Sequence, residues 1–197
     1  MIASPGDLAD AAALADGIGA RFIDTVIVLD APVGSNATRA RPALDARVLA
    51  HPLDGDFGAQ RCRAQDACRA PWVLQLDADE RPEPALLDAM DALAAMADRQ
   101  GLRSLGFRRR NLVDGVWSDL WPDIQYRLNR RELRFRGRVH ERPDAGGWRR
   151  SAIVPLGAIE HRLDGKRVRE RTRRYGAMEA TGARETDETA LLRPFRP

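Results

Sequence analysis

The chain has 197 residues, a length that favours one compact domain with its own hydrophobic core. Hydrophobic residues make up 44% of it and charged residues 31%, which excludes disordered, collagen-like and disulfide-rich proteins. No apolar run approaches the ~18 residues that a membrane-spanning helix needs, and residues 1–20 lack the basic start of a signal peptide. The two cysteines, Cys62 and Cys68, fit a reduced compartment, so we expect a cytoplasmic protein.

Charge is distributed unevenly along the chain. Residues 1–100 carry 9 basic and 16 acidic side chains, a net charge of −7, whereas residues 101–197 carry 23 and 13, a net charge of +10. A basic half next to an acidic half favours an anionic partner, such as a phosphorylated substrate, an acidic membrane surface or a nucleic acid.

Strand and helix patterns alternate in the first 100 residues. Strands are expected at 1–4, 25–29, 47–50 and 72–76, and helices at 7–18, 57–69 and 83–99. Ser4 and Pro5 provide the N-cap and first position of the first helix, and residues 31–38 form a loop followed by a short helix that Pro42 limits. Apolar strands that alternate with helices predict a parallel sheet with helices on both faces.

The second half has a different pattern. Short strands of mixed direction are expected at 104–110, 124–129, 133–138 and 152–159, followed by an arginine-rich helix at 165–183. We therefore predict one α/β domain over residues 1–197. It has three α/β/α layers, a mostly parallel central sheet and an irregular, mixed second half.

Two carboxylates, Asp77 and Asp79, directly follow the strand at 72–76. Open α/β sheets bind ligands at the carboxyl ends of their strands, and residues i and i+2 of an extended chain point to the same side. Mg²⁺ and Mn²⁺ prefer such oxygen ligands together with phosphate and water. The alternative is that these carboxylates favour the dipole of the helix that follows. Asp30 ends the strand at 25–29 and is expected near the same edge, unless it caps a turn.

In the second half, basic residues alternate with aromatic and apolar ones over residues 121–131 and 135–141. This pattern is typical either of a half-buried strand or of a positive wall around a phosphate. His140 and Glu141 could move or accept a proton, although surface placement is the more common explanation. The histidines lack close zinc-ligand spacing, and the phosphate-loop, dinucleotide-binding and hydrolase motifs are absent from the sequence.

Taken in order, these segments resemble the family 2 glycosyltransferases of the GT-A fold, in particular the branch that builds the bacterial lipopolysaccharide core. The matching stretches are HPLDGDFGAQR (51–61), WVLQLDADER (72–81), WPDIQYRLNRR (121–131), FRGRVHE (135–141), IEHR (159–162) and the run Arg173-Arg174-Tyr175. The resemblance implies transfer of a sugar, with inversion, from a nucleotide-diphosphate sugar to a cell-envelope glycan or a lipid-linked acceptor. It also implies a GT-A fold and a location at the inner face of the cytoplasmic membrane.

The resemblance implies roles for residues of the first half, which would bind the nucleotide sugar. Asp30, Gln60, Arg61 and Asp77 would contact the donor. Asp79, together with Asp77, would hold a divalent metal, Mg²⁺ or Mn²⁺, which would neutralise the diphosphate as the sugar–phosphate bond breaks.

The second half would bind the acceptor. Glu141 would be the base that deprotonates the acceptor hydroxyl, with Asp123 as the second candidate. The arginine-rich helix at 165–183 has two interpretations from its residues alone, a solvated helix face or peripheral contact with anionic lipid headgroups. Candidate contacts to acceptor or phosphate are Gln125, Arg127, His140 and His161.

The sequence departs from the family pattern on the nucleotide side. Residues 1–7 leave only a stub of the usual first strand and lack its Asn-Glu pair, and the loop at 31–38 reads APVGSNAT in place of a Ser/Gly/Asp-rich turn. These departures favour an alternative hypothesis, a catalytically silent glycosyltransferase-like protein that binds a glycan or a protein. No nucleic-acid motif accompanies the basic half, so a nucleic-acid partner is not expected.

Overall fold

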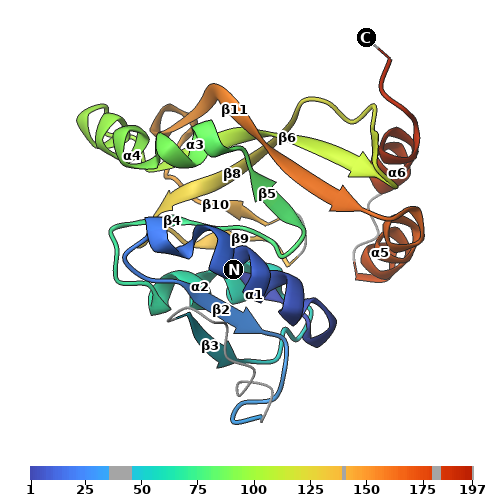
Figure 1. The fold of residues 1–197 in the computed structure, drawn as a ribbon, viewed down its shortest axis with the longest axis horizontal. Coiled ribbons are helices and arrows are strands. Elements are labelled where there is room, and N and C mark those ends of the chain that lie inside the picture. The colour runs from blue at the N-terminus through green and yellow to red at the C-terminus, as the bar shows by residue number, and fades with distance from the viewer. Residues whose placement is uncertain (36–45, 139–140, 179–182, 197) are drawn as a thin grey trace. The chain divides into compact units, whose positions relative to one another are not determined.

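The computed structural model describes residues 1–35, 46–138, 141–178 and 183–196 (Figure 1). His140 and the short helix expected after residue 38 therefore fall outside the described residues. The chain forms two compact units that alternate along the sequence. The first unit consists of Met1–Ala78, Met90–Leu105 and Tyr126–Ala152, and the second of Asp79–Ala89, Gly106–Gln125 and Ile153–Pro197. The assignment of residues 1–100 to the donor and 101–197 to the acceptor stays a prediction.

A small parallel sheet lies in the first unit. Its strands are β1 (Ile2–Ala3), β2 (Val26–Leu29) and β3 (Arg47–Ala50), in that spatial order. Ile2 pairs with Val28, and Val26 pairs with Arg47. The predicted strands at 25–29 and 47–50 are confirmed. The apolar and β-branched residues of β2 suit its central, fully buried place, whereas β3 lies at the edge and alternates exposed and half-buried residues.

Helices cover both faces of this sheet, as predicted. Ile27 and Leu29 of β2 pack against α1 (Leu8–Ile18), whereas Val26 and Val28 pack against Ala64 of α2 (Phe57–Ala67). Successive side chains of a strand point to opposite faces, so β2 is buried along its whole length. Figure 1 shows α1 in front of β2. A 3-10 turn at Pro5–Asp7 precedes α1 and another at Gly19–Arg21 follows it.

A second, mixed sheet has six strands. In spatial order its members are β4 (Trp72–Leu74), β8 (Asp123–Arg130), β6 (Ser104–Val113), β11 (Ser151–Leu163) and β5 (Glu80–Pro82), and β7 (Val116–Trp117) pairs with β6. β4 pairs antiparallel with β8, β5 with β11, and β7 with β6. The prediction of a mostly parallel central sheet is therefore wrong, because β4 joins this mixed sheet. In the described part of the chain, an isolated parallel bridge joins Asp77, which follows β4, to Ile2 of β1.

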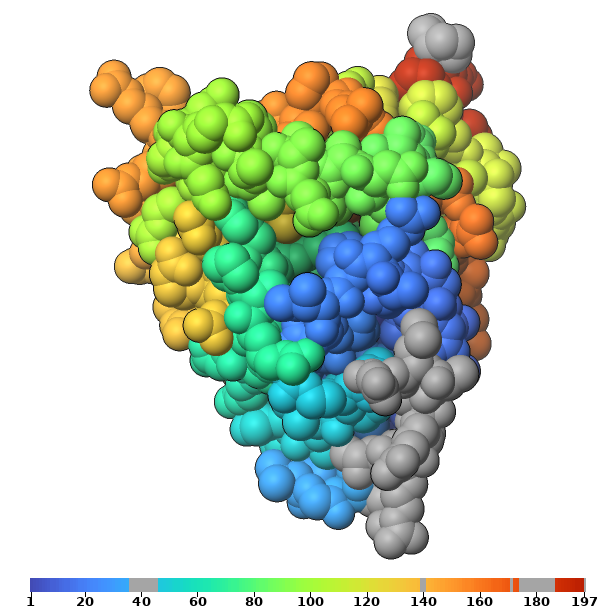
Figure 2. Space-filling view, turned by 60° about the vertical axis from the view of Figure 1, so that its left-hand side comes forward, coloured from blue at the N-terminus to red at the C-terminus, as the bar shows by residue number. Residues whose placement is uncertain are grey.

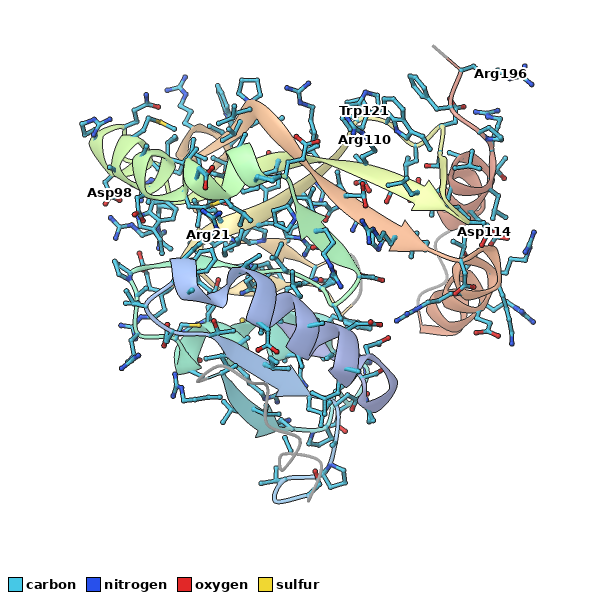
Figure 3. All side chains as sticks on the ribbon, in the orientation of Figure 1. Arg21, Asp98, Arg110, Asp114, Trp121 and Arg196 are labelled. Carbon is cyan, nitrogen blue, oxygen red and sulfur yellow. The ribbon has the colours of Figure 1, made fainter. Side chains whose placement is uncertain are left out.

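Several predicted elements have different bounds. The helix at 83–99 is divided at Ala89 into α3 (Pro84–Asp88), in the second unit, and α4 (Met90–Arg99), in the first. The indole of Trp72 donates a hydrogen bond to Asp98 of α4 at 2.9 Å, which ties this helix to β4. Figure 3 shows Asp98 on α4. The strand at 133–138 shrinks to β9 (Phe135–Arg136), which pairs with β10 (Arg142–Pro143).

The C-terminal part of the second unit contains two helices where one was predicted. α5 (Gly165–Met178) occupies most of the expected helix at 165–183, and α6 (Ala183–Leu192) was not foreseen. Val168 of α5 packs against Val113 and Leu163, with Leu191 and Leu192 of α6 on the same cluster. Within the described parts of the chain, no helix is both long and apolar enough to cross a membrane.

Candidate functional site

Asp77, the first carboxylate of the Asp-x-Asp motif, is held by two buried arginines of the first unit. Nη2 of Arg61 donates to both Asp77 oxygens, at 2.8 and 3.1 Å, and Nη2 of Arg127 donates to Oδ2 at 2.8 Å. The side chains of Arg61 and Arg127 are only 4% and 6% exposed. Both oxygens of Asp77 are therefore engaged by guanidinium groups, which makes this carboxylate an anchor for the two arginines.

Arg61 also binds Glu141, the predicted base. Its Nε donates to Oε1 of Glu141 at 2.5 Å, so one guanidinium group from α2 bridges two carboxylates that lie far apart in the sequence. Burial acts to lower the pKa of Arg61, but the carboxylates of Asp77 and Glu141 outweigh it and raise the pKa above its ordinary value. We call Arg61, Asp77, Arg127 and Glu141 the Arg61 cluster. Its two positive and two negative charges balance.

Asp30 and Gln60 lie in the first unit and both bind the backbone of the segment that follows β3. The carboxylate of Asp30 accepts a hydrogen bond from the backbone N–H of Leu53 at 2.8 Å, and the amide of Gln60 donates to the carbonyl of His51 at 2.8 Å. Gln60 is fully buried. Both side chains thus fix the path of residues 51–53, and their predicted contacts to a nucleotide stay predictions.

Asp79, the second carboxylate of the motif, lies in the second unit beside His161. Nε2 of His161 is 3.4 Å from Oδ2 of Asp79, and its Nδ1 is 2.7 Å from Oδ1 of Asn111. The amide nitrogen of Asn111 donates to Asp123, at 3.1 Å, so the oxygen is the atom that faces His161. An amide oxygen can only accept, so the proton of His161 lies on Nδ1.

His161 is therefore expected to carry a lone pair on Nε2. Burial, and secondly the charge of Arg109, lower the pKa of His161 below its ordinary value in spite of the nearby Asp79 carboxylate. The lowered pKa favours the neutral form of the ring at pH 7, and the residue is only 2% exposed. Nε2 is buried and has no hydrogen-bond partner among the residues that the structure describes. Nε2 of His161 thus faces Oδ2 of Asp79 at 3.4 Å, and the charge and hydrogen bonding of Asp79 act against the lowering of the His161 pKa.

Arg109 links two acids of the same unit. It donates from Nε to Oδ2 of Asp123 at 2.8 Å and from Nη1 to Oε1 of Glu80 at 3.1 Å, and Gln125 donates to the other Asp123 oxygen at 2.7 Å. Burial acts to raise the pKa of Asp123, but Arg109 and the hydrogen bonds from Asn111 and Gln125 outweigh it and lower the pKa. A carboxylate with a lowered pKa and several donors is a weak base.

These groups come from four neighbouring strands. We call the following residues the His161 cluster: Glu80 of β5, His161 of β11, Arg109 and Asn111 of β6, Asp123 and Gln125 of β8, and Asp79, which directly precedes β5. Because β8, β6, β11 and β5 are consecutive in the sheet, side chains on one face of it meet.

The structure thus places eight of the eleven predicted site residues in two clusters, whereas Asp30 and Gln60 lie in neither and His140 is outside the described residues. The Arg61 cluster contains Arg61, Asp77, Arg127 and Glu141, and the His161 cluster contains Asp79, Asp123, Gln125 and His161. Among the described residues, no group of three or more His, Cys, Asp and Glu side chains is arranged to hold a metal ion. Glu80, Arg109 and Asn111 were missed as site residues. The one signal in the sequence that could have found two of them is the spacing of Arg109 and Asn111, which are two residues apart in a strand and therefore lie on the same face of it.

Comparison with solved structures finds proteins of similar fold. No protein-family model matches the chain. The structure is similar to the crystal structure of S. aureus TarS 1-349, with a TM-score of 0.49 and 11% sequence identity. The match covers 97% of this chain and 69% of that chain.

Proposed function

We propose that the protein is a metal-dependent, inverting glycosyltransferase that moves a sugar from a nucleotide-diphosphate sugar to a cell-envelope glycan or a lipid-linked acceptor at the inner face of the cytoplasmic membrane. The supporting observation is that Asp79, the second carboxylate of the Asp-x-Asp motif, lies beside His161. Two acceptors 3.4 Å apart, one of them a buried lone pair without a donor, suit a divalent cation that both can bind.

The donor set fits such an ion. Asp79 supplies a carboxylate oxygen and His161 a neutral imidazole nitrogen, and Asn111 fixes the ring through its other nitrogen. When bound, the metal supplies positive charge that offsets the charge of the leaving diphosphate. Asp123 then has a supporting role, because it holds the Asn111 amide in place while Arg109 neutralises it.

Glu141 is the proposed base for the acceptor hydroxyl. Asp123 is less suited, since four donor groups from three side chains already bind its oxygens and lower its pKa. Among the side-chain contacts of the described residues, Arg61 binds Glu141 and orients one of its oxygens, and the Glu141 side chain is 13% exposed. We propose that Asp77 acts through Arg61 and Arg127, which it positions for an anionic donor, and not as a metal ligand.

The alternative, a silent glycan-binding relative, is favoured by one observation. Both oxygens of Asp77 are occupied by Arg61, so only the second carboxylate of the motif remains as a candidate metal ligand. Such a protein would bind a glycan without needing a nucleotide or a metal.

The test is calorimetric titration of the full chain with UDP and then other nucleoside diphosphates, with and without Mn²⁺. We expect binding that requires Mn²⁺ and that is lost in Asp79→Asn and in His161→Gln. Asp66→Asn is the matched control, because Asp66 is 57% exposed and pairs only with the surface residue Arg134 in the ion pairs described. Failure of the folded wild-type chain to bind any nucleoside diphosphate would contradict the proposal, and glycan binding in that case would support the alternative.

A further inference from the structure

The most exposed tryptophan of the described chain is Trp148, in the first unit. It is 81% exposed, whereas the other three tryptophans are half-buried and engaged. Trp72 binds Asp98, and the rings of Trp117 and Trp121 meet edge to face with centroids 5.4 Å apart. Trp148 contacts only the guanidinium of Arg149, 5.3 Å from its ring centroid, among the ring contacts found. An indole ring exposed to water lacks the stabilising free energy that its burial would provide.

The backbone of this segment is held in place. Gly146 and Gly147 have φ values of 78° and 129°, which favour glycine, and they lead into the 3-10 turn Trp148–Arg150. The N–H of Arg150 donates to the carbonyl of Gly147 at 3.1 Å, and the N–H of Arg103 donates to the carbonyl of Arg150 at 2.8 Å. The exposure of Trp148 therefore follows from a fixed turn between β10 and β11. Figure 2 shows side chains in the colour of this segment projecting from the surface next to α4.

Positive charge is concentrated at the tip of the turn. Arg149 and Arg150 are exposed, and residues 145–151 contain no acidic side chain. The preceding acid, Asp144, is ion-paired with Arg136 at 2.5 Å. Around the turn, other arginines are ion-paired with acidic residues, such as Arg130 with Asp98 and Arg103 with Glu132.

We propose that the turn of residues 146–150 is a membrane-contact element that places Trp148 at the headgroup level of an anionic bilayer, with Arg149 and Arg150 on the lipid phosphates. Tryptophan is enriched at membrane–water interfaces because one end of its ring is apolar and the other polar. Arginine can bury its aliphatic stem while its guanidinium stays at the phosphates. A single aromatic tip with two cations complements a flat anionic surface, whereas a nucleic acid would need a continuous basic track, which the flanking ion pairs interrupt.

This proposal does not depend on the glycosyltransferase activity, and it differs from the contact through residues 165–183 that the sequence suggested. The electrostatic part should weaken with salt, since each arginine near an anionic surface contributes about 1 kcal/mol, or about fivefold in affinity. The contribution of the indole ring to binding should remain at high salt, because salt does not screen the burial of apolar surface.

The first experiment is co-sedimentation of the full chain with large unilamellar vesicles of phosphatidylcholine with and without phosphatidylglycerol. We expect binding to the anionic vesicles only, reduced roughly tenfold in Trp148→Ala and more than tenfold in Arg149→Gln/Arg150→Gln. The matched control is Lys166→Gln/Arg173→Gln, which removes the same charge from exposed positions of α5. Loss of binding in that control, but not in the turn variants, would assign the contact to α5 and overturn the proposal.

The second experiment locates the ring. Brominated phosphatidylcholine, mixed into the anionic vesicles, quenches only those tryptophans that enter the bilayer. We expect quenching in the wild-type chain and its loss in Trp148→Phe, a variant that keeps an aromatic ring and most of the binding. Quenching that persists in Trp148→Phe, failure of the wild-type chain to bind anionic vesicles, or binding of a single-stranded oligonucleotide that Trp148→Ala abolishes would overturn the proposal.

Discussion

At the scale of single residues, Asn111 decides which nitrogen of His161 carries the proton. Its amide group has one donor side, turned to Asp123 and the Leu120 carbonyl, and one acceptor side, turned to Nδ1 of His161. Arg109 donates to the carboxylate of Asp123. His161 donates to Asn111, which in turn donates to the same carboxylate. One charged residue therefore sets the orientation of a neutral ring two side chains away.

Asp123 should stabilise the fold in a pH-dependent way. Its pKa in the folded chain is lower than the ordinary 3.8, so its contribution is fully present above about pH 4 and is lost as the pH falls through the folded pKa. We expect Asp123→Asn to lower the free energy of unfolding by about 2 kcal/mol at pH 7. Urea denaturation between pH 7 and pH 3 should show the difference from wild type shrinking below about pH 4.

Asp66→Asn provides the comparison for this measurement. Asp66 and its partner Arg134 are 57% and 54% exposed and 2.9 Å apart, so the change should alter the free energy of unfolding by less than about 0.5 kcal/mol at pH 7. A difference between Asp123→Asn and wild type that stays constant from pH 7 to pH 3 would contradict the lowered pKa of Asp123.

At the scale of elements, the sequence predicts those parts whose residues interact locally. The run Val26–Leu29 is apolar and β-branched, and its burial between α1 and α2 follows from that pattern. The strand β5 could not be predicted, because Glu80 at its start is a fully buried acid, and Arg109, which pairs with it at 3.1 Å, lies far along the chain.

The same reasoning applies to the candidate site. The carboxylates at 77 and 79 were identifiable because they directly follow an apolar strand. The sequence could not show that the two carboxylates have different partners. Asp77 contacts Arg127 because β4 pairs with β8, whereas Asp79 contacts His161 because β5 pairs with β11. Such pairings depend on long-range register, which no local pattern encodes.

Gly58, in the first turn of α2, should be intolerant of a side chain. A Cβ atom there would lie 2.6 Å from the backbone oxygen of Gly137, closer than real Cβ contacts come. The helix also begins against this segment, since the N–H of Phe57 donates to the carbonyl of Arg138 at 2.9 Å. We expect Gly58→Ala to lower the free energy of unfolding by about 1–3 kcal/mol, measured by urea denaturation.

Gly17→Ala is the matched change in a helix without that contact. Gly17 lies near the end of α1, and its Cβ would have nothing within 4 Å. Here alanine should raise the free energy of unfolding by about 0.5–1 kcal/mol, because glycine loses more backbone entropy in a helix. Equal effects of the two substitutions would refute a steric role for the backbone at Gly137.

At the scale of the whole molecule, the two units share continuous strands. The division between them falls within β6, after Leu105, within β8, after Gln125, and within β11, after Ala152. Three strands thus contribute one end to each unit. Strands are stabilised by their ladders along their whole length, so loss of one end removes order from the other.

We therefore expect one cooperative unfolding transition for the whole chain, in spite of its two units. The tryptophans allow a test, because Trp72 and Trp148 lie in the first unit and Trp117 and Trp121 in the second. In Trp117→Phe/Trp121→Phe the fluorescence reports on the first unit alone, and in Trp72→Phe/Trp148→Phe on the second. Within each variant, the urea midpoint from fluorescence should equal the midpoint from far-ultraviolet circular dichroism. Distinct midpoints in either variant would mean that the units unfold separately and that the shared strands do not couple them.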